Sequence, residues 1–197
     1  MSLMIVEDKG QQAGKHEIKH QWFDCHDIEL LQAPLPVGDY ILYTDAVADV
    51  IKRKMDRGVA LKKMDFVGSY KIAVDTKRDL QEIIGNICGK QHGRFRDECR
   101  FAQDNGIMLY VLVENEDGVK TVDDLQYWEN PRIKIQKWIT TPSGIRRKVR
   151  KYPDVTRGET LGKAMLTMQE KYGVKFLFCR PEEAGEHILK LLTLQEG

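Results

Sequence analysis

The stretch that decides the fold is Tyr70-Lys71-Ile72-Ala73-Val74-Asp75-Thr76-Lys77. Residues 70–75 are mostly apolar, with β-branched and aromatic side chains, a composition typical of a buried strand. The strand leads into Asp75-Thr76-Lys77, and side chains two residues apart lie on the same face of a strand. The sequence therefore predicts a carboxylate and an ammonium side by side at the end of a buried strand.

A second acid lies upstream, in Gly38-Asp39-Tyr40, after an extended approach fixed by Pro34 and Pro36. Two carboxylates, Asp39 and Asp75, are suited to a divalent cation such as Mg²⁺ or Mn²⁺, because hard cations prefer oxygen ligands. Beside them, Lys77 would orient or deprotonate an attacking water and stabilise a phosphodiester transition state. These parts indicate a metal-dependent nuclease. The alternative is that Asp39 is a turn residue and Asp75 a helix-capping acid.

Strands and helices alternate along the chain, which predicts an α/β fold with a mixed sheet flanked by helices. We expect strands at residues 3–6, 28–31, 40–43, 70–75, 107–113 and 174–178. We expect helices at residues 11–24, 46–55, 80–87, 93–104, 159–172 and 181–194. The apolar run 107–113 predicts a central strand buried on both faces. Residues 128–152 are basic and interrupted by Pro and Gly, which predicts a loop.

Composition limits the class of protein. The chain has 197 residues, a formal charge of +1 and four cysteines without CxxC spacing. This length fits one domain with a sizeable core. No apolar run approaches the ~20 residues that span a bilayer. Without a signal-like start, the cysteines are expected to be reduced thiols, and the protein is expected to be cytoplasmic.

Charge is unevenly distributed, because no acid occurs between Glu129 and Asp154. Lys and Arg supply sequence-independent affinity for nucleic acid by neutralising phosphates, so this segment predicts DNA contact; the alternative is a solvated loop. The residues expected to bind DNA are Lys134, Lys137, Arg146, Arg147, Lys148, Arg150 and Lys151. Residues 52–63 form a weaker second basic segment.

The order of these motifs resembles the XPF-type nuclease domain, a family within the PD-(D/E)XK superfamily. The family's core is Gly-Asp, a spacer, Glu-Arg-Lys and a nearby Asp; the counterparts here are Gly38-Asp39, Asp75-Thr76-Lys77 and Asp79. Residues 93–98 resemble the family's Gly-Arg-x-x-x-Gln helix, and residues 5–8 its opening Val-Asp-x-Arg-Glu. The resemblance covers residues 4–115, and the remainder is similar to the tail of small phage- or prophage-encoded members.

This resemblance implies a restriction-endonuclease-like mixed sheet and a single nuclease domain over residues 1–197. Its core would span 4–115, with a helix-strand-helix extension over 120–197 packed on it. The implied catalytic residues are Asp39, Asp75, Lys77 and Arg94, and the implied ligands of Mg²⁺ or Mn²⁺ are Asp39, Asp75 and Asp8. The alternatives are that Asp8 only ends a strand and that Arg94 only pairs with Glu98 on a helix surface.

The sequence departs from the family at several positions: Asp75 replaces Glu, Thr76 replaces Arg, Glu98 replaces Gln, and Gly10 and Gln11 replace the opening Arg and Glu. The resemblance implies a structure-specific endonuclease that cuts DNA junctions, forks or flaps in phage replication or recombination and leaves 3′-hydroxyl and 5′-phosphate ends. By analogy it also implies a homodimer. The alternative is a catalytically degenerate nuclease fold that binds DNA or scaffolds partners.

Overall fold

A six-stranded mixed sheet forms the centre of this computed structural model, which describes residues 3–10 and 16–194. Its strand order is β2-β1-β3-β4-β5-β8. The strands are β1 (Leu3–Asp8), β2 (Ile28–Ala33), β3 (Tyr40–Leu42), β4 (Ile72–Lys77), β5 (Met108–Glu114) and β8 (Lys175–Cys179). Only β3 runs antiparallel to its neighbours, whereas the other pairs are parallel. The predicted mixed sheet is confirmed.

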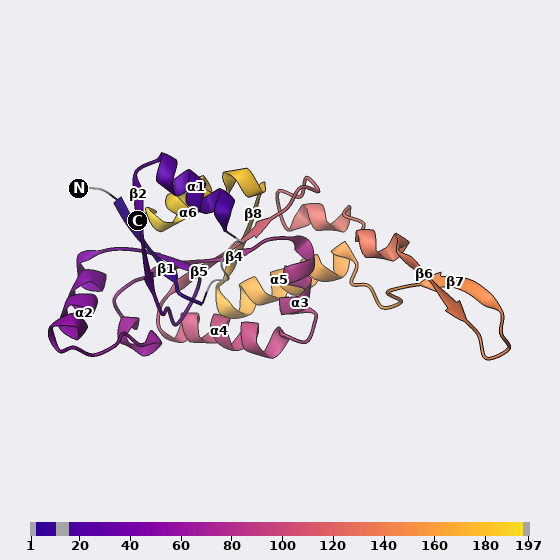
Figure 1. Ribbon diagram of the computed structural model, residues 1–197, viewed down its shortest axis with the longest axis horizontal. Coiled ribbons are helices and arrows are strands. Elements are labelled where there is room, and N and C mark those ends of the chain that lie inside the picture. The colour runs from indigo at the N-terminus through magenta and orange to yellow at the C-terminus, as the bar shows by residue number, and fades with distance from the viewer. Residues whose placement is uncertain (1–2, 11–15, 195–197) are drawn as a thin grey trace.

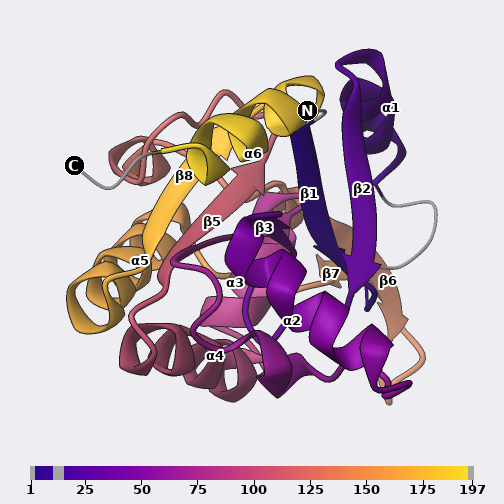
Figure 2. The same ribbon diagram turned by 90° about the vertical axis from the view of Figure 1, so that its left-hand side faces the viewer.

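Helices cover both faces of this sheet (Figures 1 and 2). One face carries α2 (Asp45–Asp56), α3 (Leu80–Ile87), α4 (His92–Asp104) and α5 (Gly158–Tyr172). The opposite face carries α1 (Glu17–Cys25) and α6 (Ala184–Leu192). Of the helix expected at 11–24, residues 11–15 lie outside the described residues, and the observed helix α1 begins at Glu17. This two-sided cover confirms the α/β arrangement.

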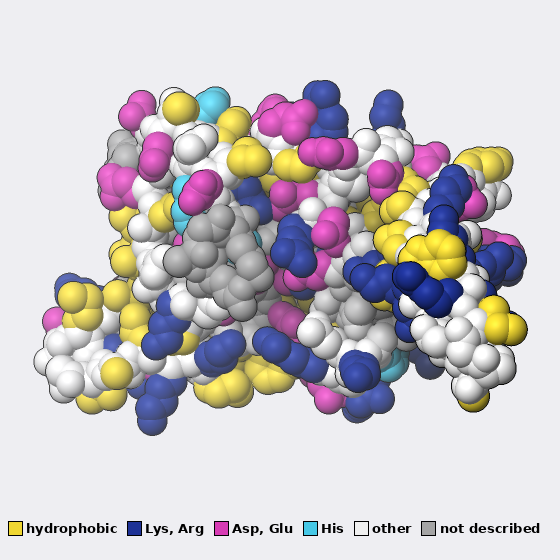
Figure 3. Space-filling view, turned by 45° about the vertical axis from the view of Figure 1, so that its right-hand side comes forward, with side chains coloured by type: hydrophobic (Ala, Val, Ile, Leu, Met, Phe, Trp, Pro, Cys, Tyr) yellow, Lys and Arg dark blue, Asp and Glu magenta, His cyan; other side chains and the backbone are white. Residues whose placement is uncertain are grey.

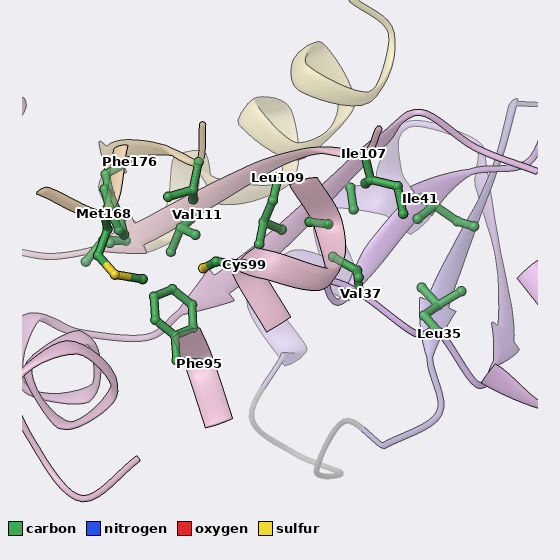
Figure 4. Packing of buried hydrophobic residues seen from close by; sticks show 14 of the residues in the cluster. Leu35, Val37, Ile41, Phe95, Cys99, Ile107, Leu109, Val111, Met168 and Phe176 are labelled. Carbon is green, nitrogen blue, oxygen red and sulfur yellow. The ribbon is translucent and has the colours of Figure 1, made fainter. Parts of the chain in front are cut away.

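Both faces of β5 are buried, as its apolar sequence predicts. Leu109 and Val111 pack with Phe95 and Cys99 of α4 in the larger core cluster (Figure 4). Leu112 points to the other face, into the smaller cluster beneath α1 and α6. The neighbouring strand β4 continues through Asp75 to Lys77, further than predicted. The acid and the lysine therefore belong to the strand itself.

Residues 128–152 contain a hairpin, so the predicted loop is wrong. Strands β6 (Gln136–Thr140) and β7 (Arg146–Arg150) pair antiparallel in a separate two-stranded sheet that projects from the body (Figure 1). Short 3₁₀ turns lie at Lys63–Phe66 (η1), Asp123–Gln126 (η2), Pro131–Lys134 (η3) and Pro181–Glu183 (η4). Strand β8, within the segment expected to pack on the core, pairs with β5 in the main sheet. No helix among the described residues has the length and apolarity to cross a membrane.

Candidate active site

Three predicted acids meet at one edge of the sheet. Because β3 runs opposite to β1 and β4, the residue before it, Asp39, lies where those strands end. The Asp8 N–H donates to the Asp39 carbonyl at 2.7 Å, and the Asp39 N–H donates to the Val74 carbonyl at 2.8 Å. Asp8, Asp39 and Asp75 line one cavity of about 290 Å³ together with Lys77 and Arg94. The carboxyl ends of parallel strands are the usual place for ligand sites in such sheets.

Asp75 and Lys77 form a buried pair on β4, as the alternation of strand side chains predicts. Asp75 is 4% exposed and Lys77 8% exposed. Lys77 Nζ donates to Asp75 Oδ1 at 2.8 Å and lies 2.6 Å from Oδ2, without hydrogen-bond geometry to that second oxygen. Burial raises the pKa of the Asp75 carboxyl. Burial alone would lower the pKa of Lys77, but the carboxylates of Asp75 and Asp39 outweigh it and raise that pKa.

Thr76 holds the Asp39 carboxylate from the adjacent strand. Both its N–H and its hydroxyl donate to Asp39 Oδ2 at 2.8 Å. Among the described residues, Asp39 Oδ1 receives no hydrogen bond from protein. The residue that replaces the family's arginine therefore positions one acid and leaves its second oxygen available to a ligand.

Gly38 fits the turn before Asp39 for a steric reason. Its φ is +71°, and a Cβ there would lie 2.9 Å from the Ala73 Cβ. The Gly38 N–H donates to Glu98 Oε1 on α4 at 3.0 Å. Glu98 thus supports the Gly-Asp turn and does not pair with Arg94. The Arg94 guanidinium lines the cavity without an ion pair or hydrogen bond to any described residue.

The acids at this edge can be tested for their fit to a divalent cation. Within the described part of the chain, no three His, Cys, Asp or Glu side chains are grouped so that they could together hold a metal ion. Asp8 Oδ1 is occupied, since it accepts the Leu35 N–H at 2.9 Å. Among the described residues, Asp39 Oδ1 and Asp8 Oδ2 accept no hydrogen bond, and Asp75 Oδ2 accepts none but lies 2.6 Å from the Lys77 ammonium. This set fits Mg²⁺, which keeps several waters and is commonly held by one or two carboxylates. A role for Asp8 as a third ligand stays a prediction.

Two further buried acids near the site, Glu7 and Glu114, were not predicted as site residues from the sequence. Glu7 is buried and accepts hydrogen bonds from His20 Nε2 at 2.7 Å and from the Tyr40 hydroxyl at 2.9 Å. Burial, followed by the Glu7 carboxylate, raises the pKa of Tyr40. Lys19 and Glu114 form a buried ion pair. Both line a wider cavity of about 710 Å³ that also contains Asp39 and Lys77.

Of the buried ion pair, the sequence contains a signal for Glu114 but not for Lys19. Glu114 directly follows the apolar run 107–113, as Asp75 follows its own apolar run, so an acid at the end of a buried strand is the sequence signal for Glu114. Lys19 lies in a polar helix that gives no local sign of burial. Its position depends on where α1 packs against the sheet.

The residues predicted to bind DNA lie away from the acids. Lys134 is in η3 and pairs with Glu129 Oε2 at 2.6 Å. Lys137 is on β6, Lys151 follows β7, and the others lie on β7: Arg146, Arg147, Lys148 and Arg150. Lys and Arg side chains gather around the hairpin, which comes forward on the right of Figure 3. The structure therefore separates the buried Asp75–Lys77 pair from an exposed basic projection.

This arrangement can be compared with known proteins. The family profile described as the ERCC4 domain matches residues 8–192. The chain belongs to the ERCC4 domain family. ERCC4 domains are XPF-type nuclease domains, and the members of the family are endonucleases, so the predicted family is confirmed. The match to the ERCC4 domain covers most of residues 4–115 and continues to residue 192, through the segment that resembles the tail of small family members.

Two solved structures share the fold of this ERCC4 domain. XPF from Aeropyrum pernix has a TM-score of 0.50 and 15% identity, covering 96% of this chain and 63% of that chain. XPF from Aeropyrum pernix in complex with DNA has a TM-score of 0.51 and 14% identity, with the same coverage of 96% and 63%. The chain thus spans less than two thirds of those proteins' length, and at these identities the likeness concerns the fold. No curated protein matches the chain.

Proposed function

We propose that this protein is a divalent-metal-dependent endonuclease that hydrolyses DNA phosphodiesters. One observation carries the proposal: the buried Asp75–Lys77 pair and the Asp39 carboxylate line the same cavity at the sheet edge. A buried charge pair that opens into a cavity is costly to maintain and is commonly found at functional sites. Membership of a family of endonucleases supports the same conclusion.

The roles of the side chains follow from their contacts. Asp39 would hold Mg²⁺ or Mn²⁺ through Oδ1, which accepts no hydrogen bond from the described residues, and Asp75 through Oδ2, an oxygen that the cation would share with the Lys77 ammonium 2.6 Å away. Such a cation lowers the pKa of a bound water and neutralises charge on a phosphate. Lys77 carries its positive charge beside them and would donate to a phosphate oxygen as negative charge develops. Arg94, with its guanidinium unpaired among the described residues, would bind an adjacent phosphate through its planar fork.

The substrate we propose is branched DNA, such as a junction, fork or flap. A DNA complex of XPF from Aeropyrum pernix, which shares the fold, supports DNA as the nucleic acid. The basic hairpin that projects from the same body supplies positive charge that can bind phosphates. A role in phage replication or recombination and a homodimer stay predictions from the resemblance. Light scattering during size-exclusion chromatography tests the dimer.

The test incubates the whole chain with fork, flap, four-way-junction and linear duplex DNA, in Mg²⁺ or in EDTA. We expect Mg²⁺-dependent cleavage of a branched substrate, reduced by about a hundredfold or more in Asp75→Asn and in Lys77→Ala. Asp104→Asn and Lys163→Ala make the same chemical changes at exposed positions and should leave cleavage intact.

Each outcome of this test has a distinct meaning. Binding without Mg²⁺-dependent cleavage of any substrate would contradict the enzyme and support the alternative, a degenerate nuclease fold that binds DNA. Cleavage that survives both Asp75→Asn and Lys77→Ala would instead contradict the assignment of the site.

A further inference from the structure

The arm, which we define as residues 136–150, is a two-stranded ribbon that stands apart from the main sheet (Figure 1). In the described part of the chain, β6 and β7 pair with each other and with no other strand. A lone hairpin of this kind is marginally stable in water by itself. An exposed ribbon that contributes no strand to the main sheet points to a contact with something outside the molecule.

One face of the arm combines positive charge with an aromatic ring. The pairing register places Trp138 opposite Lys148, with Arg146 and Arg150 on the same face. The Trp138 side chain is 56% exposed, and the charged ends of Arg146 and Lys148 each lie 5.3 Å from its ring centroid. These contacts hold cations over an aromatic platform.

The other face of the arm is basic as well. Lys137 and Arg147 alternate with the partly buried Ile139 and Val149. No Lys or Arg of the arm pairs with a carboxylate of any described residue. The arm therefore carries uncompensated positive charge on both faces, which matches a polyanion that surrounds it on more than one side.

The base of the arm is fixed next to the active site. The buried Asn130 accepts hydrogen bonds from Gln81 Nε2 of α3 at 2.9 Å and from the Arg132 N–H at 3.0 Å. Its amide donates to the Thr156 carbonyl at 3.0 Å, on the returning chain. Gly158, on the returning chain, packs so closely against residue 125 that a Cβ there would lie 2.1 Å from the Leu125 carbonyl oxygen. The segment that leads into the arm and the segment that returns from it are thus hydrogen-bonded to each other at Asn130, beside α3.

This base also forms part of the cavity. Arg132, which precedes the arm, lines the cavity of about 710 Å³ that contains Asp39 and Lys77. A duplex whose phosphate occupies the cavity would leave it past Arg132 and along the arm. The arm is thus placed to contact DNA that flanks the cleaved bond.

We propose that the arm inserts into the major groove of the duplex flanking the phosphodiester that the active site cuts. This inference rests on the proposed function. The major groove, about 12 Å wide, admits a two-stranded ribbon without deformation of the DNA, whereas the minor groove, about 6 Å wide, would first have to be widened. Five residues in each strand at about 3.3 Å per residue span roughly 5 base pairs. In the groove, cations on both faces can reach the phosphates of the two strands.

The experiment measures equilibrium binding of the whole chain to a flap DNA in EDTA, so that cleavage is not required. The variant is Arg146→Ala/Lys148→Ala/Arg150→Ala, and the control of equal charge is Lys163→Ala/Lys171→Ala/Lys190→Ala on α5 and α6. We expect the arm variant to bind at least about tenfold more weakly, with a salt dependence reduced by roughly 2.7 log units per log unit of salt. The control should bind like the wild type.

Two further measurements test which groove of the DNA the arm enters. Trimming the duplex flank by roughly 5 base pairs should remove the difference between wild type and arm variant. Methyl green, a major-groove ligand, should displace the arm-dependent part of binding, and netropsin, a minor-groove ligand, should not. Circular dichroism and urea unfolding check that the variant folds.

The proposal is overturned if the arm variant binds like the control, if netropsin alone abolishes the difference, or if single-stranded DNA loses affinity equally. Because these readouts require no cleavage, they are separate from the test of the enzyme. Arm-dependent binding by a protein that never cleaves would contradict the proposed function alone. Cleavage by a protein whose binding ignores the arm would contradict the arm alone.

Discussion

The sheet edge and the arm are both polar, yet they are built in opposite ways. At the edge, Asp75 and Lys77 are 4% and 8% exposed, and each compensates the other's charge. On the arm, Trp138 is 56% exposed and the surrounding cations have no carboxylate partner among the described residues. Groups that share one buried network act as a unit, whereas separated exposed charges contribute nearly independently. We therefore expect substitutions at the sheet edge to change the cleavage rate and substitutions on the arm to change DNA binding.

The largest expected effect is on the cleavage rate at saturating protein, where differences in DNA binding no longer contribute. At saturating protein, Lys77→Ala should reduce the single-turnover cleavage rate by about a thousandfold, because a charge aimed at the transition state is lost. The triple arm substitution should stay within about threefold of the wild type, since saturation restores its binding. Rapid-quench measurements on labelled flap DNA give both rates. An arm variant that stays slow at saturation would show that the arm takes part in the reaction itself.

The next effect concerns stability. Lys77→Met leaves the Asp75 carboxylate buried without its partner and should lower the free energy of unfolding by about 3 kcal/mol. Adding Asp75→Asn should recover most of that loss, because both charges are then gone. Lys148→Met on the arm should change the value by less than about 0.5 kcal/mol. Urea unfolding followed by circular dichroism measures all three. A double variant no more stable than Lys77→Met would refute the pairing argument.

The turn before Asp39 allows a matched pair of glycine substitutions. Gly38→Ala places a Cβ on a residue with left-handed backbone conformation, 2.9 Å from the Ala73 Cβ. We expect the free energy of unfolding to fall by about 2 to 3 kcal/mol. Gly118→Ala has φ +79° but nothing within 4 Å of the new Cβ, so only about 1 kcal/mol of strain remains. Thermal unfolding compares them. Equal losses would mean that the close approach to β4 does not matter.

The smallest effect is expected at Thr76. Thr76→Val removes the hydroxyl that donates to Asp39 Oδ2 but keeps the backbone N–H bond to the same oxygen. The loss of one hydrogen bond, about 1 kcal/mol, corresponds to a cleavage rate lower by about fivefold. Thr76→Ser keeps the hydroxyl and should cleave like the wild type. If Val and Ser behave alike, the hydroxyl does not position Asp39.

Local sequence rules predicted the centre of the site well. Period-2 alternation placed Asp75 and Lys77 on one face, and the observed hydrogen bond between them confirms it. The apolar run 107–113 predicted the central strand, and β5 occupies that position with both faces buried. These features depend on residues close in sequence, which is why they could be predicted.

Features that depend on distant contacts were missed. The arm has short, basic strands. Their pairing, such as Trp138 with Lys148, could not be predicted because the strands lack an alternation of apolar and polar residues. The buried Lys19–Glu114 ion pair joins residues from α1 and β5, and neither residue type is normally buried unless it is paired. Such contacts arise from tertiary packing, so a single sequence contains no local sign of them.

The central claim is that Asp39 and Asp75 together hold a divalent cation. Isothermal titration calorimetry with Mn²⁺ in the absence of DNA tests it on the wild type, Asp39→Asn, Asp75→Asn and the exposed control Asp104→Asn. We expect each site variant to lose at least about tenfold in Mn²⁺ affinity, because a coordinating carboxylate becomes a neutral amide. The control should match the wild type. Unchanged Mn²⁺ binding in both site variants would contradict the account.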